Sequence, residues 1–342
     1  MKPVIVTVDV EGHVGKDPVR RLIFGETDTG RFGIEYIMDA FDKVQAKILF
    51  FVDFAEAWDY GRHEVEKVVR VILERGHHVG VHIHPDHMAD KDRAFLWQYG
   101  RDEQYDIIKK CTDLYIEITG KQPKSFRAGK YGANHDTLDI LCELGYKYDF
   151  SQFYGQKWCG INPPITINAP VRYKSLIEFP VTMHQSIHLG SFVREDKIDI
   201  EQMTISEMKY ALHQTANCLF PTVVSLFFHS FSLLDWVNEP DNPIVKSKKI
   251  KKLEAAIRYI AASDSFAFIS ELELNDIETV NRKDAMNSKI VWNSNIKGIW
   301  YTYLKACRIA KRNQKAKLLV IGINSVLLIV VMTLVICGLL FI

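Results

Sequence analysis

The stretch that says most about this chain covers residues 76–87 and reads Gly76-His-His-Val-Gly-Val-His-Ile-His-Pro-Asp-His87. Residues 79–83 predict a short buried β-strand, which Pro85 ends. Because side chains alternate along a strand, His82 and His84 point to the same face. Two imidazoles on one face at the end of a strand suit a divalent metal of the zinc type. The competing interpretation is a surface loop that happens to be rich in histidine.

Short apolar strands alternate with amphipathic helices on both sides of this stretch. We expect strands at residues 4–9, 47–53, 79–83, 125–127, 147–150, 222–229 and 266–269. We expect helices at residues 33–44, 63–74, 102–119, 134–144, 204–218 and 243–262. Residues 151–203 are rich in turn residues and are expected to decorate one end of the fold with strands and loops. The alternation predicts one large α/β domain with a mostly parallel sheet.

Polar side chains gather where these strands end. Asp9 and Glu11 follow the first strand, His82 ends the third, Arg127 ends the fourth, and His229 ends a later one. In parallel α/β barrels, the carboxyl ends of the strands carry the chemistry. Two carboxylates beside two imidazoles make a mixed nitrogen and oxygen site that leaves a metal open to water. The alternative is that the two acids are ordinary turn residues.

Five motifs occur in a fixed order along the chain. They are Thr7-Val-Asp-Val-Glu-Gly12, Phe50-Phe-Val52, Gly76-His-His-Val-Gly-Val-His82, Phe126-Arg-Ala-Gly-Lys-Tyr-Gly132 and Leu226-Phe-Phe-His229. In this order they resemble the polysaccharide deacetylases of the NodB type, carbohydrate esterase family 4, over residues 3–270. The resemblance implies a deformed (β/α) barrel that removes an N-acetyl group from a sugar with the help of a metal.

The resemblance also implies catalytic roles. Asp9 is expected to be the general base that acts on water, and Arg127 to pair with it and orient it. A backbone N–H near Tyr131 is expected to hold the oxyanion, and His229 to protonate the leaving amine. The arginine motif departs from the family pattern by one extra residue before Tyr131.

The metal ligands carry over less completely. Glu11 and His82 are the expected ligands, although the family usually has two adjacent aspartates where this chain has Asp9 and a valine. The second histidine normally lies four residues after the first, a position that is aspartate here. Either His84 or His87 must then supply the second imidazole, and the shared strand face favours His84. Zinc is the preferred metal for such ligands, but other divalent ions fit them as well.

The last part of the chain differs in composition. Residues 318–342 carry no charge, and basic residues precede them at positions 305–317. We therefore expect a catalytic barrel at 1–274, a linker and basic juxtamembrane segment at 275–317, and a transmembrane helix at 318–342. The positive-inside rule then predicts a single-pass C-terminal anchor with the catalytic domain in the cytoplasm.

Composition bounds the remaining possibilities. A net charge of +1 gives no argument for a nucleic-acid partner, and the six cysteines are scattered without a C-x-x-C pair, which favours reduced thiols. The expected function is metal-dependent hydrolysis of an N-acyl group on a sugar of a glycan or lipid- or nucleotide-linked glycan precursor at the membrane, with glycan-synthesis enzymes as partners. The alternatives are an amide hydrolase with a non-sugar substrate and an inactive glycan-binding scaffold.

Overall fold

The chain forms two compact units. The computed structural model describes residues 1–12, 15–189, 192–220, 223–288, 296–311 and 313–340. The first unit comprises Met1–Met183 and Lys197–Lys289, and the second comprises His184–Asp196 and Ile290–Ile342. Residue 222 of the strand expected at 222–229 and part of the linker expected at 275–317 lie outside the described residues. All residues discussed below as a functional site belong to the first unit.

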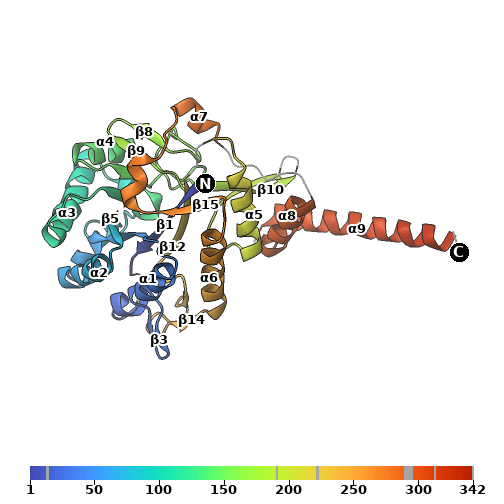
Figure 1. Ribbon diagram of the computed structural model, residues 1–342, viewed down its shortest axis with the longest axis horizontal. Helices are drawn as coiled ribbons and strands as arrows, with labels where there is room; N and C mark the ends of the chain where they lie inside the picture. Colours follow the sequence, from blue (N-terminus) through green and yellow to red (C-terminus); the bar gives the residue numbers. More distant parts are fainter. Residues whose placement is uncertain (13–14, 190–191, 221–222, 289–295, 312, 341–342) are drawn as a thin grey trace. The chain divides into compact units, whose positions relative to one another are not determined.

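A mostly parallel sheet forms the centre of the first unit (Figure 1). Its strands follow in the order β12-β1-β4-β5-β6-β7-β9-β8, and β15 also pairs with β1. Among the described residues, the β8–β9 pair is the one antiparallel pair of this sheet. The sheet strands are β1 (Lys2–Val10), β4 (Leu49–Asp53), β5 (His78–Ile83), β6 (Ser125–Ala128), β7 (Tyr148–Asp149), β8 (Val171–Tyr173), β9 (Leu176–Glu178), β12 (Val224–His229) and β15 (Phe266–Ile269). The order of paired strands runs from β12 to β8, and in the described part of the chain these two end strands do not pair with each other. The sheet is therefore an open half-barrel.

Helices connect the parallel strands, as the alternating pattern predicts. They are α1 (Ile34–Asp42), α2 (Arg62–Glu74), α3 (Arg101–Thr119), α4 (His135–Glu143), α5 (Ile205–Ala216), α6 (Ser247–Ala261) and α7 (Arg282–Met286). In α2 the buried residues are Val65, Val68, Val69 and Ile72, whose spacing of three and four residues places them on one face. Single-turn helices follow three strands: η2 (Phe54–Trp58) after β4, η3 (Pro85–His87) after β5, and η5 (Gly129–Tyr131) after β6.

Short antiparallel pairs lie outside the main sheet. They are β2 (Glu26–Thr27) with β3 (Gly30–Arg31), β10 (Met183–Leu189) with β11 (Phe192–Lys197), and β13 (Leu234–Asp235) with β14 (Ile244–Val245). The remaining single-turn helices are η1 (Val19–Ile23), η4 (Leu96–Gln98) and η6 (Glu271–Asp276). The β10–β11 pair belongs to the turn-rich region, which was expected to supply strands and loops.

The central strand β1 explains why the first apolar run of the sequence is continuous. Its residues from Val4 to Val10 are all buried, because the strand is covered on both faces. Aromatic side chains fill one side of the sheet: Phe51 packs against Phe150, with ring centroids 5.3 Å apart and the rings tilted by 58°. A carboxylate at the end of such a strand therefore sits at the edge of a dry, rigid core.

The C-terminal helices belong to the second unit, and they overturn one prediction. They are α8 (Ile296–Ile309) and α9 (Gln314–Leu340). Among the described residues, no helix is long and apolar enough to cross a membrane. The predicted transmembrane helix and single-pass anchor are therefore wrong, and the cytoplasmic placement derived from them falls as well.

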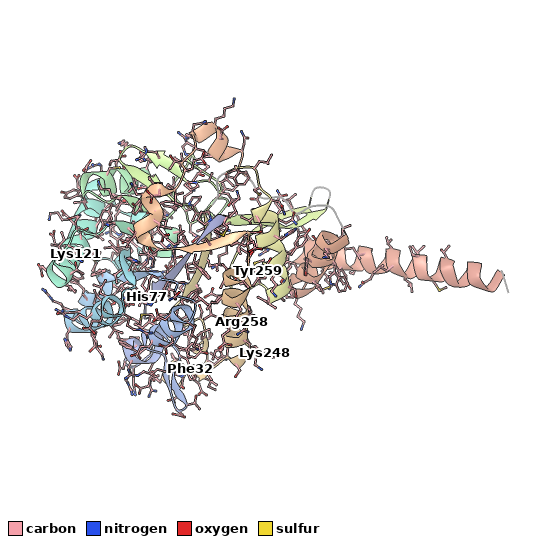
Figure 2. The ribbon with its side chains drawn as sticks, viewed as in Figure 1. Phe32, His77, Lys121, Lys248, Arg258 and Tyr259 are labelled. Atoms are coloured by element: carbon pink, nitrogen blue, oxygen red, sulfur yellow. The ribbon has the colours of Figure 1, made fainter. Side chains whose placement is uncertain are left out.

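His77, labelled in Figure 2, comes directly before β5, whereas His82 lies near the other end of that strand. Its Nδ1 accepts a hydrogen bond from the backbone N–H of Ile48 at 3.2 Å, and its Nε2 lies 3.3 Å from Oδ1 of Asp42. Burial, together with the charges of Lys47 and Arg75, lowers the pKa of His77 to about 4, although the charge of Asp42 opposes this. This histidine is thus a neutral part of the core.

A pH-dependent stability follows from this buried histidine. Above pH ~6.5 the imidazole is neutral in both the folded and the unfolded chain. Between pH ~6.5 and the folded pKa of about 4, only the unfolded chain takes up the proton, so the free energy of unfolding falls by up to about 3 kcal/mol. We expect His77→Gln to remove this contribution. Urea unfolding of both proteins across this pH range should give converging stabilities toward acid, and parallel curves would contradict the assignment.

Candidate functional site

The strand register brings distant residues to one level at the carboxyl edge of the sheet. Asp9 on β1 pairs with His229 on β12, and His82 on β5 pairs with Arg127 on β6. Glu11 follows β1 by one residue. Because parallel strands end at the same edge, residues more than a hundred positions apart in the sequence become neighbours here.

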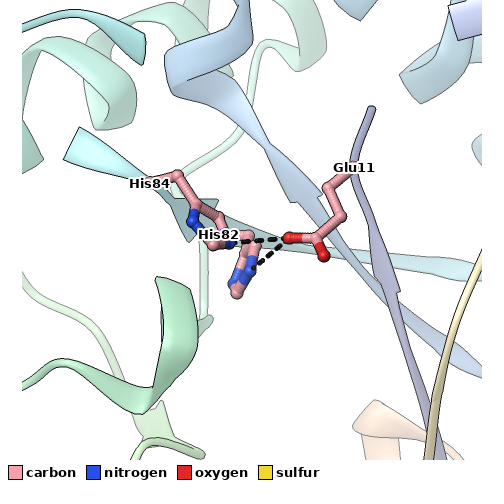
Figure 3. A group of neighbouring side chains, drawn as sticks. All are labelled: Glu11, His82 and His84. Atoms are coloured by element: carbon pink, nitrogen blue, oxygen red, sulfur yellow. Dashed lines mark ion pairs between the residues drawn. The ribbon is translucent and has the colours of Figure 1, made fainter. Parts of the chain in front are cut away.

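Glu11, His82 and His84 form a buried cluster at this edge (Figure 3). The Oε2 atom of Glu11 lies 2.6 Å from Nε2 of His84 and 3.5 Å from Nε2 of His82. The two imidazole rings are 5.0 Å apart between centroids, at 71° to each other. The side chains are 8% exposed or less. Each nitrogen or oxygen that faces the centre of the cluster can bind a metal.

The chemistry of this donor set fits a divalent cation. One ligand atom from each residue lies within 4.8 Å of the others, and a carboxylate with two imidazoles is typical of sites that leave positions open for water. Nδ1 of His82 lies 2.8 Å from the backbone carbonyl of Arg127, which fixes the ring with Nε2 toward Glu11. Burial would lower the pKa of His82, but the charges of Asp9, Glu11 and Asp53 raise it to about 9.

The sequence left open whether His84 or His87 supplies the second imidazole, and the structure places these two residues in different clusters. His84 is in contact with Glu11, whereas His87 lies on η3 and turns toward a different group of acids. Nδ1 of His87 is 2.6 Å from Oδ2 of Asp59, and its Nε2 is 3.9 Å from Oδ2 of Asp53. The geometry therefore groups His84 with Glu11 and His82, and leaves His87 outside this cluster.

Asp9 and Arg127 form a buried ion pair beside the cluster. Nη1 of Arg127 donates to Oδ1 of Asp9 at 2.5 Å, and Nη2 donates to Oγ1 of Thr7 at 2.9 Å. Arg127 is 1% exposed, and its guanidinium lies 4.3 Å from the centroid of the Phe51 ring. Held by strand residues and an aromatic wall, Arg127 fixes the position of the Asp9 carboxylate.

His229 completes the group from the other side. Its Nε2 lies 3.6 Å from Oε1 of Glu11, and its Nδ1 lies 2.9 Å from Oε1 of Glu201. Burial disfavours the charged imidazole, but the hydrogen bond and charge of Glu201, with the charges of Glu11 and Asp9, outweigh it and raise the pKa of His229. The pKa of Glu201 is correspondingly far below its usual range, although burial opposes this.

Glu201 is the residue that sequence reasoning missed. It lies between β11 and α5 in the turn-rich region, where no periodic pattern gives its position. Ser232 donates a hydrogen bond to Glu201, and the backbone N–H of His229 donates to Oγ of Ser232 at 2.8 Å. The nearby sequence signal is the capping box that Thr204 and Glu207 form at the start of α5, and Glu201 takes no part in it. That signal points to a helix start and not to a catalytic partner.

Tyr131 lies in the tight turn after β6. Lys130 and Tyr131 have φ values of 52° and 56°, the left-handed conformation that is strained for residues other than glycine. The ring of Tyr131 is buried, with its centroid 4.9 Å from that of Phe153, and Arg127 lies 5.7 Å from the ring. The turn brings the Tyr131 backbone to the end of β6, near Arg127. The role of this backbone at an oxyanion stays a prediction.

Comparisons with known proteins show similarity to deacetylases. The sequence model of the polysaccharide deacetylase family matches residues 22–148. A peptidoglycan deacetylase-like protein of Gibberella zeae is 33% identical over 112 residues, which cover 31% of this chain and 30% of the relative. The peptidoglycan deacetylase of Helicobacter pylori is 24% identical over 145 residues, or 41% and 42% of the two chains. The chain thus spans less than half the length of these curated relatives.

Solved structures support the fold. A Mycobacterium smegmatis protein assigned to the polysaccharide deacetylases superposes with a TM-score of 0.54 at 17% identity, covering 80% of this chain and 88% of the other. A 4-α-glucanotransferase of Thermococcus litoralis reaches a TM-score of 0.52 at 9% identity over 86% of this chain and 42% of its own. Because two different kinds of carbohydrate enzyme share the fold, the fold alone does not name a reaction. In its motifs, its sequence relatives and its fold, the chain is thus similar to the NodB-type polysaccharide deacetylases of carbohydrate esterase family 4.

Proposed function

We propose that this protein hydrolyses the N-acetyl group of an amino sugar in a glycan, using one divalent metal held by Glu11, His82 and His84. The observation that carries this proposal is the position of that buried cluster between the Asp9–Arg127 pair and the His229–Glu201 pair. A ligand set, an oriented carboxylate and a charged imidazole are the groups that hydrolysis of an amide requires.

The metal is expected to be zinc, because a carboxylate with two imidazoles is typical of zinc hydrolases. A divalent cation bound there supplies Lewis acidity, which polarises the acyl carbonyl and makes water easier to deprotonate. Glu11 and His84 provide ligand atoms that already converge, at 2.6 Å from each other. The backbone carbonyl of Arg127 keeps His82 in the orientation that a ligand needs.

Asp9 acts as the general base in this proposal. Its Oδ1 is held by Arg127, so the carboxylate has a fixed direction when it takes the proton from the attacking water. The buried position favours an oriented attack, because the base loses little conformational freedom on reaction. In this proposal the backbone N–H groups of the turn at Tyr131 stabilise the negative oxygen that forms.

His229 acts as the general acid. Its Nδ1 is bound by Glu201, so Nε2 is the nitrogen that faces the cluster and can give a proton to the leaving amine. An amide nitrogen is a poor leaving group unless it is protonated, so this step is as necessary as the attack of water. The raised pKa of His229 keeps the proton on the imidazole until the C–N bond breaks.

The substrate proposed is a glycan that contains N-acetylated sugars. The named relatives are a peptidoglycan deacetylase and a peptidoglycan deacetylase-like protein, and the family name specifies polysaccharides. A scaffold that only binds glycans is disfavoured by the two oriented pairs, since binding needs neither a base fixed by an arginine nor an acid fixed by a carboxylate.

Removal of a metal ligand should abolish both metal binding and turnover. We expect Glu11→Gln and His82→Ala to lose the metal and to lower kcat for acetate release from an N-acetylglucosamine oligomer by about a thousandfold or more. His63→Gln changes an exposed histidine of α2 and should leave both unchanged. Metal content by mass spectrometry and acetate release by enzymatic assay check this. Full activity of a metal-free Glu11→Gln protein would sink the proposal.

Loss of the base should separate chemistry from binding. Asp9→Asn keeps the size of the side chain but cannot accept the proton, so we expect kcat to fall by about a hundredfold to ten-thousandfold. Metal content and KM should change little, because Asp9 is not among the proposed ligands. Kinetics on the same oligomer, with metal analysis in parallel, provide the test. Unchanged kcat would exclude Asp9 as the base and would favour a different reaction.

Glu201→Gln tests the positioning of the acid. We expect kcat on the amide substrate to fall by about tenfold to a hundredfold while the metal is retained. The loss should shrink on 4-nitrophenyl acetate, whose leaving group departs without a proton. Glu278→Gln, at an exposed glutamate of the same unit, is the matched control. Equal losses on the amide and the ester would assign Glu201 a merely structural role.

A further inference from the structure

A second group of buried acids and an imidazole lies next to the proposed catalytic cluster. Asp53, Glu56 and His87 each offer one ligand atom, and these atoms all lie within 4.8 Å of one another. Asp53 ends β4, Glu56 lies on η2, and His87 closes η3, so the group sits at the carboxyl edge of the sheet. Asp53 is 0% exposed and Glu56 is 1% exposed. In the deacetylation proposed for the neighbouring cluster, none of the three takes part.

One oxygen in this group has no hydrogen-bond partner. Oδ1 of Asp53 accepts hydrogen bonds from the backbone N–H of Ala55 at 3.0 Å and of His84 at 3.3 Å. Oδ2 of Asp53 is buried without a hydrogen bond, and the nearest cationic atom is Nε2 of His87 at 3.9 Å. A buried carboxylate oxygen without a partner costs free energy, and the direction in which it points marks the place of a missing ligand.

His87 is held as a metal-binding histidine is. Its Nδ1 lies 2.6 Å from Oδ2 of Asp59, and Lys91 lies 2.6 Å from the same oxygen. With the Nδ1 proton donated to Asp59, Nε2 keeps its lone pair and turns it toward Asp53. A carboxylate that fixes one nitrogen so that the other can bind is typical of the residues around metal ligands. His82 has the same arrangement, with the carbonyl of Arg127 in place of Asp59.

The charges in this group are not balanced by basic side chains. Glu56 is anchored by a hydrogen bond from the backbone N–H of Gly12. In the part of the chain that the structure describes, neither Asp53 nor Glu56 forms an ion pair with a lysine or arginine. Burial raises the pKa of both carboxyl groups, because the surrounding protein stabilises their negative charges less well than water does. A divalent cation would supply the missing positive charge.

We propose that Asp53, Glu56 and His87 form a second site for a divalent transition-metal cation. Two carboxylates and one imidazole are a donor set that Zn²⁺ and Mn²⁺ accept. The site goes beyond the proposed function, because none of its residues takes part in the attack on the amide. Its cation ties η2 to η3 and thereby holds the segment that carries His84, whose backbone N–H binds Asp53.

Metal stoichiometry of the full chain tests this proposal. The chelator-treated protein is dialysed against Zn²⁺, and bound metal is counted by mass spectrometry. We expect two equivalents in the unaltered protein and one in Asp53→Asn, His87→Gln and Glu11→Gln. Asp59→Asn should keep the second ion with about tenfold to a hundredfold lower affinity. Asp92→Asn, at an exposed acid of the loop after η3, should bind two.

These variants distinguish failure of the second site from failure of the proposed catalytic metal. Asp53→Asn retains an oxygen to accept the N–H of Ala55, and His87→Gln changes a side chain that is 17% exposed, so at least one should fold, as circular dichroism would show. A single equivalent that Glu11→Gln removes and His87→Gln leaves in place would overturn the second site and spare the proposed function. A single equivalent that His87→Gln removes and Glu11→Gln leaves in place would overturn the catalytic metal and support the second site.

Discussion

The buried ion pair between Asp9 and Arg127 is the constraint on which the rest of the site depends. A guanidinium that is 1% exposed loses most of its hydration, and this cost is offset only if its donors and its charge are well matched. Asp9 and Thr7 accept its hydrogen bonds, and Phe51 covers one face. These partners come from neighbouring strands, so the pair requires the sheet to be in register. In return, it fixes the carboxylate that we propose as the base at the end of its strand.

Strand β5 shows that residues at one end of the sheet stabilise the core, whereas residues at the other end belong to the candidate site. His77 precedes β5, is neutral, and binds the backbone of Ile48 inside the core. His82 is near the other end of β5, where acids surround it and raise its pKa to about 9. The two residues are chemically identical, and only the neighbours that each end of the sheet provides make one a core residue and the other a candidate ligand. This division follows the general behaviour of parallel α/β folds.

Much of this arrangement could be predicted from the sequence, because it rests on two local rules. Alternation along a strand places His82 and His84 together, and the polar ends of apolar runs reveal Asp9 and Arg127. Glu201 could not be predicted, since it lies in an irregular segment whose path is set by tertiary packing. The membrane helix was predicted wrongly because hydropathy read along the sequence treats residues 318–342 as one apolar run, whereas no described helix is long and apolar enough to span a membrane.

The electrostatics of the strand ends argue for cations as part of the folded state. Glu11, Asp53 and Glu56 are all buried at this edge, and Arg127 is already matched by Asp9. The imidazoles of His82, His84 and His87 can balance the three acids only by holding protons, which uses the nitrogens that would otherwise bind metal. The three carboxylates are therefore balanced either by protons on these imidazoles or by bound cations. Orientation of His82 by a carbonyl and of His87 by Asp59 leaves Nε2 turned inward in both, which favours the metal-loaded form.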